Sequence, residues 1–137
     1  MSATASDIVR RAYDAFRERD LDALTEISDP AIRISSVTGI LSGRETPYEG
    51  VEALAEYVRD VLTIWDQIAL VPEEFHDLGD ERVLVFGRVR ARRRQSEIDI
   101  PNAWLWTLRR GRVVSVRVYA EPTADARWLF KRRGGSR

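Results

Sequence analysis

The chain has 137 residues, 44% of them hydrophobic and 32% charged, which is the composition of one globular domain with a single core. It has no cysteine, which excludes disulfides and thiolate metal sites and suits a reducing compartment. No apolar run approaches the roughly 18 residues of a membrane-spanning helix, and the first residues lack a secretory pattern. We therefore expect a cytoplasmic protein with no membrane contact, no metal and no cofactor.

The net charge is zero, but the charges are unevenly distributed along the chain. Residues 45–81 hold one basic and 11 acidic side chains, whereas residues 82–137 hold 15 basic and four acidic ones. Either these two segments face each other in the fold and pair, or the second forms a basic surface for an anionic partner. Because nucleic-acid-binding domains are usually net basic, we expect no nucleic-acid partner.

Helical periodicity dominates the first part of the chain. Apolar residues from 8 to 16 recur on one face, which predicts a helix that is capped at Ser6 or Asp7 and runs to about residue 19. Asp20 is a suitable cap for a second, short helix over residues 21–27.

The next segment alternates between extended and irregular structure. Ile32 and Ile34 alternate with polar residues, which indicates a strand. Residues 38–50 contain three glycines and a proline and predict a long loop, in which Tyr48 is a candidate lid residue. Residues 51–64 return to helical spacing.

From residue 66 onward the period changes to that of strands. Residues 67–75 predict a strand, and Pro72 within it indicates an edge position or a bulge. A turn at residues 77–80 precedes a long strand at 83–94. Gly111 marks the turn of a closing hairpin between two further strands.

The resulting element order, ααβαββββ, predicts the α+β class, with helices covering one face of a curved, mostly antiparallel sheet. We expect a flexible N-terminus at residues 1–5, one domain at 6–128 and a basic C-terminal tail at 129–137, with a last helical turn near 125–131.

Four segments carry a resemblance to a known family. They are AYDAFRERDLDAL, Pro-Tyr-Glu-Gly before a helix, LGDERVLVFGRVRAR, and NAWLWTLRRGRVVSVRVYAEPTADA. Together, over residues 6–128, they resemble the SnoaL-like branch of the nuclear transport factor 2 superfamily, which includes relatives of ketosteroid isomerases and polyketide cyclases. The resemblance implies a cone-shaped, cystatin-like α+β barrel with an internal pocket, and a homodimer through the outer face of the sheet.

Strand alternation assigns side chains to the inside of this cone. Asn102, Trp104 and Trp106 share one face of the penultimate strand, and a buried indole N–H needs a partner. These side chains, like Tyr57 on the middle helix, either line a pocket or fill the core. The candidate ligand-binding residues are Phe16, Ser35, Tyr57, Leu62, Asn102, Trp104, Trp106, Val118 and Ala120.

The resemblance also locates positions where related enzymes carry catalytic groups. The carboxylate base falls near Ser35 and the last-strand carboxylate at Val118, while the oxyanion-hole donors fall at Ala12 and near Trp104. Tyr13 is expected to point elsewhere. None of these side chains replaces the missing acid–base group, so the catalytic residues stay unknown and enzymatic activity stays open.

Two functions remain. In the first, the chain binds a small hydrophobic molecule of sterol or polyketide size or smaller, as a binding protein or as a divergent isomerase, cyclase or hydrolase. In the second, it is a non-catalytic dimeric scaffold with a filled cavity. An internal volume of about 300 Å³ or more favours a ligand. On the outer face Arg88, Arg90 and Arg92 need nearby carboxylates such as Asp99, which predicts a ladder of ion pairs.

Overall fold

The computed structural model describes residues 4–35 and 47–119. Six strands among them form one sheet in the order β2-β1-β6-β5-β4-β3, in which only β1 and β6 run parallel. The elements are α1 (Ala5–Arg17), α2 (Leu21–Glu26), β1 (Ser28–Ser35), β2 (Tyr48–Glu49), α4 (Val51–Ile64), β3 (Gln67–Gly79), β4 (Arg82–Arg93), β5 (Ser96–Arg109) and β6 (Arg112–Tyr119).

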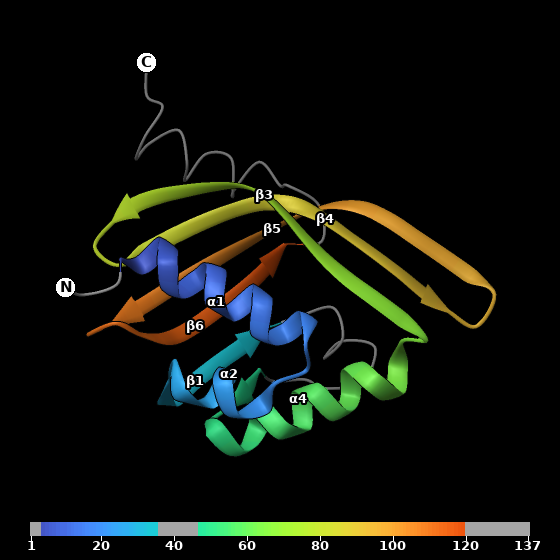
Figure 1. Cartoon of the computed structure of the whole chain (residues 1–137), viewed down its shortest axis with the longest axis horizontal. Helices are drawn as coiled ribbons and strands as arrows, with labels where there is room; N and C mark the ends of the chain where they lie inside the picture. The colour runs from blue at the N-terminus through green and yellow to red at the C-terminus, as the bar shows by residue number, and fades with distance from the viewer. Residues whose placement is uncertain (1–3, 36–46, 120–137) are drawn as a thin grey trace.

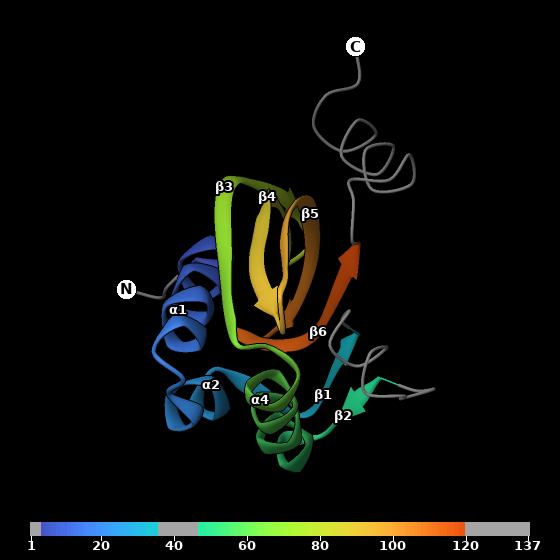
Figure 2. The same cartoon turned by 90° about the vertical axis from the view of Figure 1, so that its right-hand side faces the viewer.

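The sheet curves around the helices, which all lie on one side of it (Figures 1 and 2). α1 packs against β3 and β4, α4 packs against β1 and β2, and α2 lies between the two longer helices. The α+β class and the conical shape are therefore confirmed. The sheet is not closed into a barrel, because β2 and β3 form its two edges. The short strand β2 was not predicted.

Side-chain caps fix where the first two helices begin. Thr4, rather than Ser6 or Asp7, caps α1: the Thr4 hydroxyl accepts a hydrogen bond from the Asp7 amide at 3.1 Å, and the Asp7 carboxylate accepts one from the Thr4 amide. Asp20 caps α2 as predicted, with its carboxylate 3.0 Å from the Ala23 amide nitrogen.

Strand β3 is bent at Pro72. The pairing register with β4 shifts between Pro72 and Glu74, so the predicted bulge on an edge strand is confirmed. A Cβ atom on Gly87 of β4 would lie 2.0 Å from the Val71 carbonyl oxygen, so the bend needs a glycine there. β3 then continues to Gly79, which moves the predicted turn to Asp80 and Glu81.

Alternation along β4 and β5 directs apolar side chains to the core. Val83 and Val85 are fully buried and pack with Trp104 and Trp106 against the helices. Tyr48 is also buried, at 1% exposure, and its hydroxyl donates a hydrogen bond to Asp60 Oδ2 at 2.6 Å. Tyr48 is therefore an anchor beneath α4, and its prediction as a lid residue is wrong.

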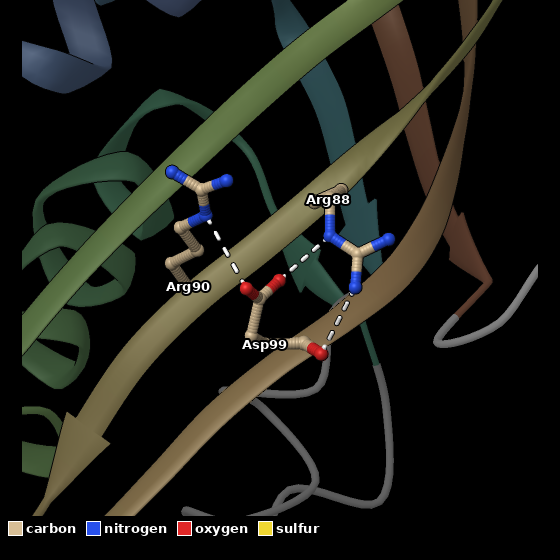
Figure 3. Close-up of polar contacts among 3 residues, drawn as sticks. All are labelled: Arg88, Arg90 and Asp99. Atoms are coloured by element: carbon tan, nitrogen blue, oxygen red, sulfur yellow. Dashed lines mark hydrogen bonds and ion pairs between the residues drawn. The ribbon is translucent and has the colours of Figure 1, made fainter.

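The outer face carries part of the predicted ion-pair ladder (Figure 3). Arg88 Nε lies 2.7 Å and Arg90 Nε 3.5 Å from the two carboxylate oxygens of Asp99, all within one chain. A hydrogen bond and the positive charge from Arg88, helped by Arg90, lower the pKa of Asp99. The expected helical turn at 125–131 and the tail at 129–137 lie outside the described residues.

Candidate functional site

Two small cavities lie inside the cone. The first, of about 60 Å³, lies between α1, α2, β1 and the ends of β5 and β6. The second, of about 70 Å³, lies beside it towards Trp65 and the far ends of β3, β4 and β5. Tyr57, Leu70, Trp104 and Val118 line both cavities and therefore form the wall between them.

Six of the nine predicted ligand-binding residues line this interior. Phe16 and Trp106 line the first cavity, Asn102 lines the second, and three more line both. Asn102 is 1% exposed, as expected for an amide on the inner face of β5. The residues common to both cavities are Tyr57, Trp104 and Val118.

The other three predicted residues are placed differently. Leu62 is 61% exposed, because Val61 takes the buried position on α4 and the next residue is rotated by about 100°. Ser35 ends β1 and lines neither cavity. Ala120 lies outside the described residues.

Tyr13 lines the first cavity, contrary to the expectation that it points elsewhere. Its ring lies edge-on to Trp104 and Trp106, at centroid distances of 5.4 and 5.3 Å. Its hydroxyl accepts a hydrogen bond from Trp106 Nε1 at 3.1 Å. α1 buries neighbouring residues in pairs, so its inner stripe is wide enough for both Ala12 and Tyr13. The signal for Tyr13 in the sequence was the buried Trp106 indole N–H, which needs a hydrogen-bond partner.

Tyr57 supplies the second phenol of the interior. Its ring lies 6.0 Å from that of Phe16 and 5.3 Å from that of Tyr48. Within the described part of the chain its hydroxyl has no hydrogen-bond partner. Burial raises the pKa of Tyr57, and the Tyr48 phenol raises it further. The side chain is therefore a neutral hydrogen-bond donor at physiological pH.

The two phenols act as a pair. Burial raises the pKa of Tyr13 well above its ordinary value, and Tyr57 is close enough to add to that rise. The Tyr13 hydroxyl accepts from Trp106 but has no acceptor for its own proton among the residues described. Both side chains line the apolar, aromatic interior, where hydrogen bonds are strong, and neither phenolic proton has an acceptor among the described residues.

No ionisable carboxylate, histidine, lysine or arginine lines either of the two described cavities. Ser28 also lines the first cavity, but its hydroxyl donates to the Leu24 carbonyl at 2.6 Å. No cluster of three potential metal ligands occurs among residues 4–35 and 47–119. The described interior can therefore bind by shape and by phenolic hydrogen bonds, but these residues supply no general base.

A larger depression, of about 540 Å³, lies outside the cone. It covers the outer-face ends of β3, β4 and β5, and it is lined by Arg90, Arg92, Glu97 and Asp99 among others. Charged side chains line this depression, whereas apolar and aromatic side chains form most of the lining of the cone cavities. An apolar molecule is recognised by burial of its surface, so the cone is the candidate site for such a ligand.

Structural comparison finds many similar folds. An NTF2-like protein of unknown function from Burkholderia pseudomallei is 21% identical with a TM-score of 0.77, over 97% of this chain and 99% of that one. TerC co-crystallised with polyporic acid is 22% identical with a TM-score of 0.76, over 93% and 98%. A protein with a ketosteroid isomerase-like fold from Catenulispora acidiphila, in complex with trimethylamine, is 14% identical with a TM-score of 0.72, over 87% and 88%.

Sequence comparison identifies the family. No curated protein matches the chain. Among the described helices, none is long and apolar enough to cross a membrane. The family model of the SnoaL-like domain matches residues 9–116, which is most of the chain, so the protein belongs to the SnoaL-like family.

Proposed function

We propose that this protein binds a small, flat, apolar molecule that carries a hydrogen-bond acceptor, inside the cone. The observation that carries the proposal is the Tyr57 hydroxyl, which has no partner among the described residues and lies on the wall between two aromatic cavities. Tyr13 supplies a second phenolic proton nearby. A carbonyl oxygen on an aromatic ring suits such a pair of donors.

Cavity volume limits the size of the ligand. The two cavities measure about 60 and 70 Å³, whereas a cavity of roughly 150 Å³ holds benzene and pockets for drug-sized ligands start near 300 Å³. A sterol-sized molecule does not fit this interior. Even when joined across Tyr57, the two cavities together stay below the benzene-sized volume, so a single aromatic ring requires the neighbouring side chains to move apart on binding.

Two of the similar structures support a small-molecule ligand. TerC was co-crystallised with polyporic acid, and the Catenulispora acidiphila protein was solved in complex with trimethylamine. At 22% and 14% identity these proteins share the fold with this chain. They support the class of function, and the ligand chemistry proposed for this protein comes from its own side chains.

Matched ligands test the proposal. Acetophenone and α-methylstyrene have nearly the same shape, but only acetophenone has a carbonyl oxygen. We expect acetophenone to raise the melting temperature and to change tryptophan fluorescence at a lower concentration than α-methylstyrene does. Tyr57→Phe should weaken the binding of acetophenone by about fivefold, which corresponds to the loss of one hydrogen bond. The affinity for α-methylstyrene should stay unchanged. Leu62→Ala, on the exposed side of the same helix, is the control and should change neither.

The second candidate function is a scaffold with a filled cone, and the small cavity volumes favour it. If neither compound binds the wild-type protein while the Trp104→Ala variant binds both, the side chains fill the interior of the natural protein. The scaffold function is then the correct one.

We also propose that the outer face of the sheet forms a homodimer. Arg88, Arg90 and Asp99 leave 34%, 61% and 53% of their side-chain surface exposed. Basic and acidic side chains thus stand side by side, and a two-fold axis can pair each kind with the other. Light scattering after size-exclusion chromatography tests this, and a monomer at every concentration up to about 100 µM contradicts it.

A further inference from the structure

The tip of the β5–β6 hairpin carries an arginine cluster that the proposed function does not use. Arg109, Arg110 and Arg112 surround a depression of about 420 Å³, together with Asp29 and Pro30 from the start of β1. All three arginines are exposed. The depression lies at the turn of the hairpin, whereas the candidate ligand site is inside the cone.

The three guanidinium groups form no ion pair within the described part of the chain. The neighbouring carboxylates accept hydrogen bonds from backbone amides rather than from these guanidinium groups. Asp29 Oδ1 accepts from the Ala31 amide at 2.8 Å, and the Glu81 carboxylate accepts from the Arg110 and Gly111 amides at 3.1 Å each.

The cluster opposes the stability of the hairpin in two ways. Arg109 and Arg112 are directly opposite each other across the strands, and like charges at such positions are unfavourable. Arg110 has a φ of 54°, in the left-handed region where asparagine or glycine is preferred in a two-residue turn. Asp80, Glu81 and Arg94 have the same left-handed φ in the other two hairpin turns, so the pair of like charges is what distinguishes this turn.

The backbone beneath the cluster is held in place. The Leu108 amide donates to the Glu81 carbonyl and the Val113 amide donates to the Ile27 carbonyl, both at 2.8 Å. The turn is thus tied to the β3–β4 turn on one side and to the end of α2 on the other. Three cationic side chains therefore project from a pre-organised support, which lowers the entropic cost of binding.

We propose that this depression binds a phosphate-type dianion, either free phosphate or a phosphomonoester. Three positive charges and one negative charge line the depression, and the Glu81 carboxylate lies beneath the turn, so a positive excess remains that favours an anion. Guanidinium groups bind phosphate oxygens through paired N–H donors, in a geometry that chloride does not reproduce. The site also accounts for part of the basic excess of residues 82–137.

NMR titration of the backbone amides tests the proposal at constant ionic strength. Inorganic phosphate and phenyl phosphate should each shift the amides of the β5–β6 turn in a saturable way, whereas chloride should not. Tighter binding of phenyl phosphate identifies the ester as the ligand class, and equal binding identifies free phosphate. Absence of saturation, or an equal response to chloride, overturns the proposal.

Arg110→Asn separates binding from folding. Asparagine suits the left-handed turn position, so the melting temperature should stay the same or rise. Phosphate affinity should fall by about fivefold, the loss expected for one exposed charge pair. Arg59→Gln removes an exposed arginine from α4 and should leave affinity unchanged. An unchanged affinity in Arg110→Asn, or an equal loss in both variants, contradicts the assignment.

Discussion

The two faces of β4 and β5 are built from different forces. Their inner face holds Val83, Val85, Trp104 and Trp106, which are at most 9% exposed. Their outer face holds the partly exposed ion pairs of Arg88 and Arg90 with Asp99 (Figure 3), next to the buried Leu84. Inside, recognition and stability depend on shape, because no charge lines the described cavities. Around Asp99 on the outer face, stability depends on charge, which salt screens. Mutations on the two faces should therefore differ in size and in salt dependence.

Trp104→Ala, on the inner face, should have the largest effect on stability. It removes a 3% exposed indole from the wall of both cavities, and we expect a loss of about 3–5 kcal/mol in the free energy of unfolding. Urea denaturation measures it. Leu105→Ala, the half-buried neighbour on the other face, is the control and should lose clearly less. Equal losses would mean that both faces are packed to the same degree.

Gly87→Ala should cause the second largest loss of stability. The new methyl group would meet the Val71 carbonyl at 2.0 Å, so β3 must shift at a cost of about 3 kcal/mol. Gly111→Ala serves as the matched glycine, since its nearest contact is at 3.7 Å and only its positive φ of 76° opposes alanine. We expect about 1 kcal/mol there. A larger loss at Gly111 would show that turn strain outweighs the inner contact.

Tyr13→Phe should cost about 1–3 kcal/mol, because it leaves the buried Trp106 N–H without its acceptor. Tyr57→Phe removes a hydroxyl with no described partner and should change the free energy of unfolding little. Chemical denaturation of both variants under the same conditions compares them. Similar losses for the two would refute the assignment of Tyr13 as the structural phenol and Tyr57 as the free one.

Asp99→Asn should have the smallest effect and a defined pH dependence. Arg88 lowers the pKa of Asp99 in the folded state, so the stabilisation is present above the ordinary carboxyl pKa of about 4 and is lost as pH falls below it. The difference in melting temperature between wild type and Asp99→Asn should shrink below pH 4. It should also shrink in roughly 1 M salt, where charges are screened beyond about 3 Å. Asp14→Asn, in an exposed helical pair, is the control.

Local patterns in the sequence were sufficient for the elements and their faces. Helical spacing located α1, α2 and α4, and strand alternation put Trp104 and Trp106 inside and Arg88 and Arg90 outside. These features depend on neighbours within a few residues, so they can be read without the fold. The two-residue strand β2 was missed because so short a segment shows no period.

The depth of each side chain was decided by tertiary structure. Tyr13 and Trp106 are 93 residues apart in the chain, and only the packing of α1 against the sheet joins them. Leu62 and Val61 are both apolar and adjacent, and the rotation of α4 alone determines which is buried. The volume left between such side chains depends on every contact at once. The sequence by itself therefore determined the cone and the aromatic lining of its wall, while tertiary packing decided how little space the cone encloses.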